Sequence, residues 1–287
     1  MILIVILIAL SLDFFLGGLE RFRNFNWCIS LYYRLEKRLA QYKFWDGTFG
    51  LLLVLSVALS ALIIVLCLAS SLPWIVEIVV SLIVLIYCLA PEDLDNRLDK
   101  YITAVDEGNV AAVTESAEGL IDETLLSEDD SNEIAIIKSS LVESHKRTFA
   151  VIFWFLILGA VGALLYRLVN ELSDEFSEIR SGFADSTSIL INILEWPSSR
   201  LMVLGLALGG HLVDAMPGWS KAEHLSIEVN NEVLTDAGIG ALQYRTDIEV
   251  PDREKSYWVD ELKGLLNRTL IIWLAILGLM TLSGTLG

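Results

Sequence analysis

Three hydrogen-bonding side chains lie close together at the end of an apolar stretch: Tyr166, Arg167 and Asn170. Residues three and four apart share one face of a helix, so Tyr166 and Arg167 both lie on the face of Asn170. A phenol, a guanidinium and an amide together suit an anionic or phosphate-bearing group. Ionisable groups within apolar spans are costly and usually face a bundle interior, a partner or a water-filled cavity. The spacing therefore predicts a polar ligand pocket among membrane helices.

Other polar residues in apolar surroundings are candidates for the same pocket. The candidate ligand-binding residues are Asp13, Tyr166, Arg167, Asn170, Trp196, Arg200 and His211, with Glu143, His145 and Glu195 as secondary candidates. The two arginines would pair with anionic groups, Asn170 would form hydrogen bonds, and Trp196 would stack or anchor at the interface. In the alternative interpretation, long side chains such as Arg167 and Arg200 snorkel to the bilayer interface.

No motif indicates a stand-alone enzyme. The chain has no GxSxG elbow and no Walker lysine motif, and no nucleophile–base pair stands out, so no catalytic residue is assigned. Cys28, Cys67 and Cys88 form no disulfide framework, and neither the cysteines nor the three histidines have the spacing of metal ligands. The sequence assigns no metal site, and the cofactor stays unknown.

These residues must be positioned by membrane helices. A span needs about 20 predominantly apolar residues, and its backbone N–H and C=O groups must form their hydrogen bonds within the segment, as they do in a helix. Five stretches meet this requirement: Met1–Leu19, Gly50–Ser70, Leu72–Leu89, Phe149–Val169 and Thr269–Leu286. The expected fold is an all-α, polytopic membrane helical bundle of five or six spans with helical soluble extensions. The lipid bilayer is therefore an expected partner of the protein. Gly159 and Gly162 are expected to allow close helix packing.

The sixth span is ambiguous. Ile189–Val213 is long enough to cross, but Glu195, Pro197 and Arg200 interrupt it. A kinked or re-entrant helix with charges at membrane depth is one interpretation. An amphipathic helix lying on the surface is the other. The side of the membrane on which the region Asp214–Lys263 lies depends on this choice.

The charge pattern predicts the organisation of the remaining segments. Leu19–Thr48 is rich in cations and aromatics and is expected to be cytoplasmic, as is Pro91–Arg147. From Asn132 the helical pattern runs unbroken into the fourth span. The expected parts are residues 1–90 (three spans and a basic interfacial loop), 91–148 (acidic cytoplasmic helices), 149–213 (fourth span and kinked or re-entrant helix), 214–265 (soluble loop region) and 266–287 (last span).

The acidic region limits the partners of the chain. The net charge is −17, and residues 92–133 hold 14 acidic residues against two basic ones, Arg97 and Lys100. Such a region repels nucleic acid and anionic headgroups, so no nucleic-acid partner is expected. A solvated helical face explains the charge, and the alternative is a site for a cation or a basic partner.

Four runs resemble one family of membrane proteins. Leu12–Gly17 resembles the opening of the motif LDxxxGDP, and Leu94–Tyr101 resembles the family's entrance into its cytoplasmic helices. Gly159–Asn170 resembles GGxxxALxYxxVN, and Leu194–Leu201 resembles (N/D)WxPxRL with its proline shifted by one. In this order the runs resemble the AmpE family of bacterial inner-membrane proteins, which belongs with the cobalamin-pathway amide synthases CobD/CbiB.

The resemblance implies a regulatory role in place of catalysis. Gly18-Leu19 replaces the Asp-Pro of the synthase motif, and Glu143–Thr148 is basic where synthases carry an acidic stretch. AmpE-like proteins lack both elements, which implies β-lactamase induction, cell-wall recycling signalling and antibiotic resistance, with an anionic or cell-wall-derived small molecule as ligand. The alternatives are an amide synthase acting on a corrinoid or another carboxylate, and a small transporter whose missing spans come from a homodimer.

Overall fold

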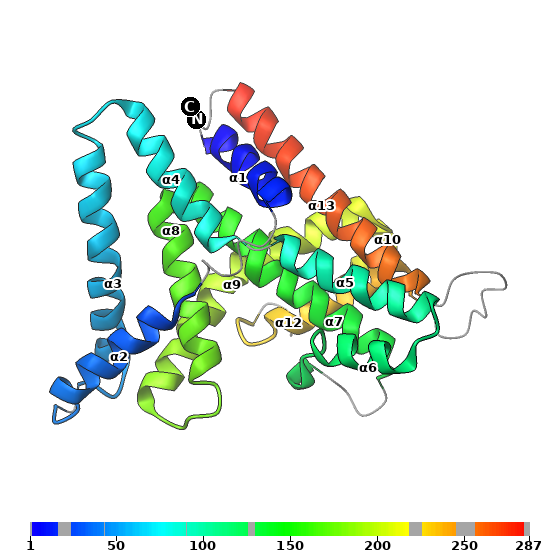
Figure 1. The fold of residues 1–287 in the computed structure, drawn as a ribbon, viewed down its shortest axis with the longest axis horizontal. Coiled ribbons are helices and arrows are strands. Elements are labelled where there is room, and N and C mark those ends of the chain that lie inside the picture. Colours follow the sequence, from blue (N-terminus) through cyan, green and yellow to red (C-terminus); the bar gives the residue numbers. More distant parts are fainter. Residues whose placement is uncertain are drawn as a thin grey trace. The chain divides into compact units, whose positions relative to one another are not determined.

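The structure is a computed structural model that describes residues 2–16, 24–42, 44–89, 91–125, 130–217, 226–244 and 256–283. Within these ranges the chain forms helices and no strand, so the all-α prediction is confirmed (Figure 1). The helices are α1 (Ile2–Leu16), α2 (Asn26–Leu39), α3 (Thr48–Ala69), α4 (Trp74–Cys88), α5 (Pro91–Asp106), α6 (Val110–Glu118), α7 (Asn132–Ser144), α8 (Ala150–Glu175), α9 (Gly182–Gly209), α10 (Leu212–Ala215), α12 (Asn230–Leu242) and α13 (Tyr257–Leu282). A 3-10 turn spans Glu123–Leu125 and a π-helical turn spans His145–Phe149.

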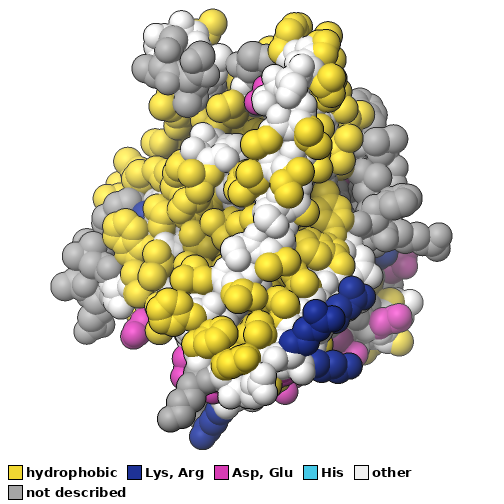
Figure 2. All heavy atoms as spheres, turned by 90° about the vertical axis from the view of Figure 1, so that its left-hand side faces the viewer, with side chains coloured by type: hydrophobic (Ala, Val, Ile, Leu, Met, Phe, Trp, Pro, Cys, Tyr) yellow, Lys and Arg dark blue, Asp and Glu magenta, His cyan; other side chains and the backbone are white. Residues whose placement is uncertain are grey.

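The described part of the chain contains four helices long and apolar enough to cross a membrane. They are Thr48–Ala69, Asn132–Glu175, Gly182–Gly209 and Tyr257–Leu282, and two shorter apolar helices lie at Ile2–Asp13 and Trp74–Cys88. Figure 2 shows one face of the molecule on which hydrophobic side chains predominate. Water disfavours so large an apolar face, and lipid accommodates it. The protein is a multi-pass membrane protein.

The chain divides into two compact units, and unit 1 consists of Met1–Ala90 and Ala150–Glu195. In this unit α4 packs between α1 and α8, and α3 packs on both α4 and α8. The short amphipathic helix α2 packs on α3 and α8. The buried apolar side chains of this unit include Ile6, Leu51, Leu85, Leu168 and Leu172.

Unit 2 consists of Pro91–Phe149 and Trp196–Gly287. Helix α7 packs on α5, α12 and α13, while α6 packs on α5 and α10 packs on α12. The spacing of the apolar positions Leu94, Leu98, Tyr101, Ile102 and Val105 predicts the inner face of α5. The first three side chains are buried there, whereas Ile102 and Val105 are partly exposed. The five-part division of the chain at 90/91, 148/149, 213/214 and 265/266 stays a prediction.

The long helix expected from Asn132 is present. The chain stays helical from Asn132 to Glu175, through α7, the π-helical turn and α8. Helix α4 begins at Trp74 because Pro73 occupies its N-cap position, so it is shorter than the expected span Leu72–Leu89. The first expected span, Met1–Leu19, is described as a helix only from Ile2 to Leu16.

Helix α9 differs in its limits from the expected Ile189–Val213. It begins at Gly182, because Asp46 Oδ1 accepts a hydrogen bond from the Phe183 N–H at 2.9 Å and Ser181 Oγ accepts one from the Ala184 N–H at 3.1 Å. It continues through Pro197 and ends at Gly209. A helix of 28 residues has the length to cross a bilayer.

The prediction for Gly159 was wrong. A Cβ atom at Gly159 would meet nothing within 4 Å, so close packing does not require this glycine. Its backbone has φ 64° and ψ −152°, a conformation that is accessible essentially only to glycine. Gly162 does allow a close approach, because a Cβ there would lie 2.3 Å from the Trp154 carbonyl oxygen. The kink at Gly159 brings the earlier turn of α8 against Gly162.

Substituting Gly159 by Ala should destabilise the protein by about 1–3 kcal/mol, because alanine cannot adopt this backbone conformation without strain. Unfolding in detergent mixtures of increasing SDS content would measure the change in free energy. Gly119→Ala is the control, since Gly119 has φ −74° and a Cβ there meets nothing closer than 3.7 Å. Equal stability of Gly159→Ala and the wild type would contradict the kink.

Candidate functional site

The predicted triad of α8 is buried in unit 1. Tyr166, Asn170 and Arg167 are exposed to only 0%, 3% and 8% of their surface. Helix α8 places them on one side because they lie within about one turn. A buried guanidinium is unusual in a protein and needs partners that compensate its desolvation.

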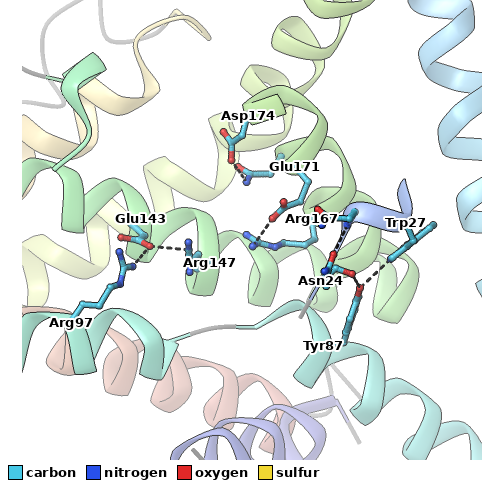
Figure 3. A network of polar contacts seen from close by, with 11 residues as sticks. Asn24, Trp27, Tyr87, Arg97, Glu143, Arg147, Arg167, Glu171 and Asp174 are labelled. Carbon is cyan, nitrogen blue, oxygen red and sulfur yellow. Dashed lines mark hydrogen bonds and ion pairs between the residues drawn. The ribbon is translucent and has the colours of Figure 1, made fainter. Parts of the chain in front are cut away.

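Acidic residues on the next turn of α8 supply those partners. Arg167 Nη2 lies 2.7 Å from Glu171 Oε1, and Asn170 Nδ2 donates to Asp174 Oδ2 at 3.0 Å (Figure 3). The Tyr166 hydroxyl donates to Glu195 Oε1 at 3.3 Å. One guanidinium, one amide and two carboxylates thus lie along this face of α8, and the ion pair and hydrogen bond between them fix the side chains in place.

Aromatic residues from α2 and α4 form the wall beside this face. The Arg167 guanidinium lies 5.2 Å from the centre of the Phe25 ring, and the Phe25 and Tyr87 rings lie 4.6 Å apart. The Tyr87 hydroxyl donates to the Asn24 carbonyl oxygen at 2.6 Å and accepts from Trp27 Nε1 at 3.1 Å (Figure 3). A cation beside an aromatic face is stabilised by the ring quadrupole.

Two polar atoms of this cluster are left without a hydrogen bond. Arg167 Nε and Asn170 Oδ1 are both buried and have no hydrogen-bond partner within the described part of the chain. Buried polar atoms are nearly always satisfied, and each exception calls for a bound water, an ion or a ligand. One donor and one acceptor on adjacent turns match a ligand that carries both an oxyanion and a hydrogen-bond donor.

The same environment perturbs Cys28, which packs on α8 from the buried side of α2. Its thiol is fully buried, and burial followed by the charge of Glu171 raises its pKa from 9.0 to about 11. Both causes disfavour the thiolate. The Cys28 thiol is therefore unreactive at neutral pH while α2 is packed on α8. Its reaction with an alkylating reagent would indicate that α2 has moved away.

In unit 2, Arg200 forms a second polar cluster. Its Nη1 donates to Ser199 Oγ at 2.9 Å and to the Asn230 side chain, and its Nη2 donates to the Ser226 carbonyl oxygen at 3.0 Å. The guanidinium lies 5.3 Å from the Trp196 ring, whose side chain is 36% exposed. Arg200 thereby joins α9 to the start of α12.

The other candidates in unit 2 are Glu143, His145 and His211. Glu143 forms ion pairs with Arg97 and with Arg147, the second at 2.9 Å (Figure 3). His145 is buried in the π-helical turn, and its Nε2 lies 2.9 Å from Ser198 Oγ. His211 is exposed and lies after the end of α9, with Nδ1 2.9 Å from Asp214 Oδ2.

The candidate residues therefore fall into both units. Tyr166, Arg167, Asn170 and Glu195 come together in unit 1, and Asp13 is buried in α1 of the same unit, at 1% exposure. Trp196, Arg200, His211, Glu143 and His145 belong to unit 2. One pocket shared by all of them stays a prediction.

The residues around the buried triad are called the α8 cluster below: Phe25, Tyr87, Tyr166, Arg167, Asn170, Glu171, Asp174 and Glu195. The sequence did not lead to the prediction of Phe25, Tyr87, Glu171 and Asp174. The i,i+4 spacing of Arg167 with Glu171 and of Asn170 with Asp174 was available in the sequence and would have identified both acids. Phe25 and Tyr87 carried no such signal, because they reach the cluster from distant parts of the chain.

Comparisons with known proteins agree on one family. The CobD/Cbib protein model matches residues 6–176, which include α8 and its triad. The cobalamin biosynthesis protein CobD of Chromobacterium violaceum is 28% identical over 170 residues, covering 58% of this chain and 54% of that protein. The protein of the same name from Stutzerimonas stutzeri is 30% identical over 111 residues, or 38% of this chain and 37% of that protein.

The match with these relatives is partial. The chain spans about half the length of the Chromobacterium protein and less of the Stutzerimonas protein. No solved structure matches the chain significantly.

Proposed function

The chain belongs to the CobD/CbiB family, and from this premise we propose that it is a membrane protein of cobalamin biosynthesis that binds an anionic substrate on α8. Its reaction would join a carboxylate, such as that of a corrinoid, to an amino-alcohol phosphate through an amide bond. The name of the two relatives supports the pathway.

The α8 cluster is the observation that carries this proposal. Its residues on α8 lie within the region shared with the family, and they include a buried guanidinium whose Nε has no partner within the described residues. A guanidinium binds phosphate or carboxylate through parallel hydrogen bonds. The Asn170 Oδ1 atom offers an acceptor for the ammonium or hydroxyl group of the same ligand.

Amide formation sets further chemical requirements. A carboxylate is a poor electrophile, so a nucleoside triphosphate is needed as co-reactant, and one carboxylate oxygen leaves with the transferred phosphate. The attacking ammonium must lose a proton before its nitrogen forms the new bond with the acyl carbon. Glu171 and Asp174 are the acids beside Arg167 and Asn170, and either carboxylate is a candidate proton acceptor.

A regulatory function is the second candidate, and Glu143 favours it. Synthases carry an acidic stretch at this place, whereas here Glu143 is engaged by Arg97 and Arg147. Such a protein would be AmpE-like, would lie in the bacterial inner membrane, and would bind a cell-wall-derived anion on α8 as a step in β-lactamase induction. A homodimer is compatible with either candidate.

An assay on the purified full chain separates the candidates. Calorimetric titration with an amino-alcohol phosphate is expected to show binding, and incubation with a corrinoid carboxylate and ATP is expected to yield the amide. Binding without turnover would support the regulatory candidate. The absence of both binding and turnover would overturn the α8 assignment.

A further inference from the structure

The outer face of α2 differs from the rest of this acidic protein. Its exposed side chains include Arg34, Lys37 and Arg38, at helical spacing on one face. The single carboxylate of α2, Glu36, accepts a hydrogen bond from the Tyr32 hydroxyl at 3.2 Å, and Tyr32 is buried. The outer face therefore carries positive charge in a chain whose net charge is −17.

Aromatic side chains flank these cations. Trp27, Tyr33, Tyr42 and Phe44 are all between 41% and 49% exposed. Helix α2 packs on α3, and the span of α3 begins at Thr48, shortly after these residues. Figure 2 shows lysine and arginine side chains gathered beside the hydrophobic face. Exposed aromatics and cations next to a span are typical of the headgroup layer.

The opposite face of α2 forms part of the α8 cluster. Phe25, just before the helix, lies against Arg167, and Cys28 is buried near Glu171. Tyr32 packs on Phe176 with ring centres 4.6 Å apart. One short helix therefore carries both faces. A contact on the outer face of α2 can change how Phe25 and Cys28 pack against α8.

We propose that the outer face of α2 binds anionic phospholipid headgroups and that this contact holds the inner face of α2 against α8. The charge of the face selects anionic over zwitterionic lipid, since each cation near a charged bilayer contributes attraction that adds to aromatic anchoring. The lipid composition of the bilayer then determines how tightly α2 packs against α8. This regulation goes beyond the proposed function and does not depend on the reaction.

Native mass spectrometry of the full chain with equimolar phosphatidylglycerol and phosphatidylcholine tests the lipid contact. The wild type should retain phosphatidylglycerol preferentially, and Arg34→Gln/Lys37→Gln should weaken its retention about 10- to 30-fold. The charge-matched control Lys100→Gln/Arg180→Gln removes two exposed cations elsewhere and should stay within about twofold of the wild type. Arg34→Lys/Lys37→Arg keeps the charges and should keep the preference.

Three results would overturn the lipid contact. One is equal retention of the two lipids by the wild type, and another is an equal loss in the charge-matched control. The third is a change of oligomeric state in Arg34→Gln/Lys37→Gln with lipid retention intact, which would assign the face to a second copy of the chain.

Alkylation of Cys28 tests the coupling to α8. In vesicles of phosphatidylglycerol, Cys28 should react at least about threefold more slowly than in phosphatidylcholine, because opening of α2 exposes its buried thiol. The fraction of Cys28 that has reacted is read by mass spectrometry from the ratio of its alkylated and unmodified peptides. The difference should vanish in Arg34→Gln/Lys37→Gln. Equal rates for the wild type in both vesicles would overturn the coupling.

Discussion

Replacement of Arg167 by Met is expected to weaken binding of an amino-alcohol phosphate about 100-fold. Methionine fills much of the same volume but offers no positive charge and no N–H donors. Loss of one partner from a buried, hydrogen-bonded charge pair costs about 2–5 kcal/mol of binding free energy. Calorimetric titration of the purified chain measures the dissociation constant, and amide formation measures the accompanying loss of turnover.

Two further variants isolate the role of the guanidinium. Arg167→Lys keeps the charge but loses Nε and the planar donor pair, so it should recover only part of the affinity. Arg180→Gln removes an exposed cation of the same unit and should bind as the wild type does. Arg167→Met should stay folded, because its partner Glu171 has 26% of its side chain exposed and can be hydrated. Wild-type affinity in a folded Arg167→Met would refute the site.

Substitution of Gly240 by Ala is expected to lower the stability of the protein by about 2–3 kcal/mol. An added Cβ would lie 2.1 Å from the Asp214 carbonyl oxygen and 3.2 Å from the Ala215 Cα. These atoms belong to the backbone of α10, so no side-chain rotation can relieve the clash. Overpacking of this kind forces backbone shifts. Unfolding by SDS titration measures the loss.

Gly264→Ala is the matched control in the same unit. Gly264 lies within α13, and a Cβ there would meet nothing closer than the mobile end of Arg268, at 3.5 Å. Alanine favours a helix interior over glycine by about 0.5–1 kcal/mol, so this variant should equal or exceed the wild type in stability. If both variants behaved alike, α10 and α12 would not make the close contact described above.

Local patterns in the sequence predicted most of the helices. The apolar runs that became α3 and α13, and the spacing of Leu94, Leu98 and Tyr101 on α5, depend on neighbours along the chain, and helical periodicity reports such neighbours directly. The same reasoning placed Tyr166, Arg167 and Asn170 on one face.

Helical periodicity could not predict contacts between residues that lie far apart in the sequence. Phe25 and Tyr87 meet Arg167 only after α2, α4 and α8 have packed, and no spacing rule links residues so far apart. The start of α9 depends in the same way on Asp46, which accepts the N–H of Phe183 from a distant loop. Gly159 could not be separated from a packing glycine, because sequence alone does not reveal a positive φ.

The interleaved order of the two units restricts how this protein can be divided. Each unit is assembled from two separate stretches of chain, with breaks after Ala90, Phe149 and Glu195. Any single cut leaves at least one of them split, so a fragment ending at Phe176, where the family match stops, would lack residues 177–195 of unit 1 and residues 196–287 of unit 2. A truncation can therefore keep one unit whole only if it also keeps a stretch of the other: residues 1–195 include residues 91–149 of unit 2, and residues 91–287 include residues 150–195 of unit 1.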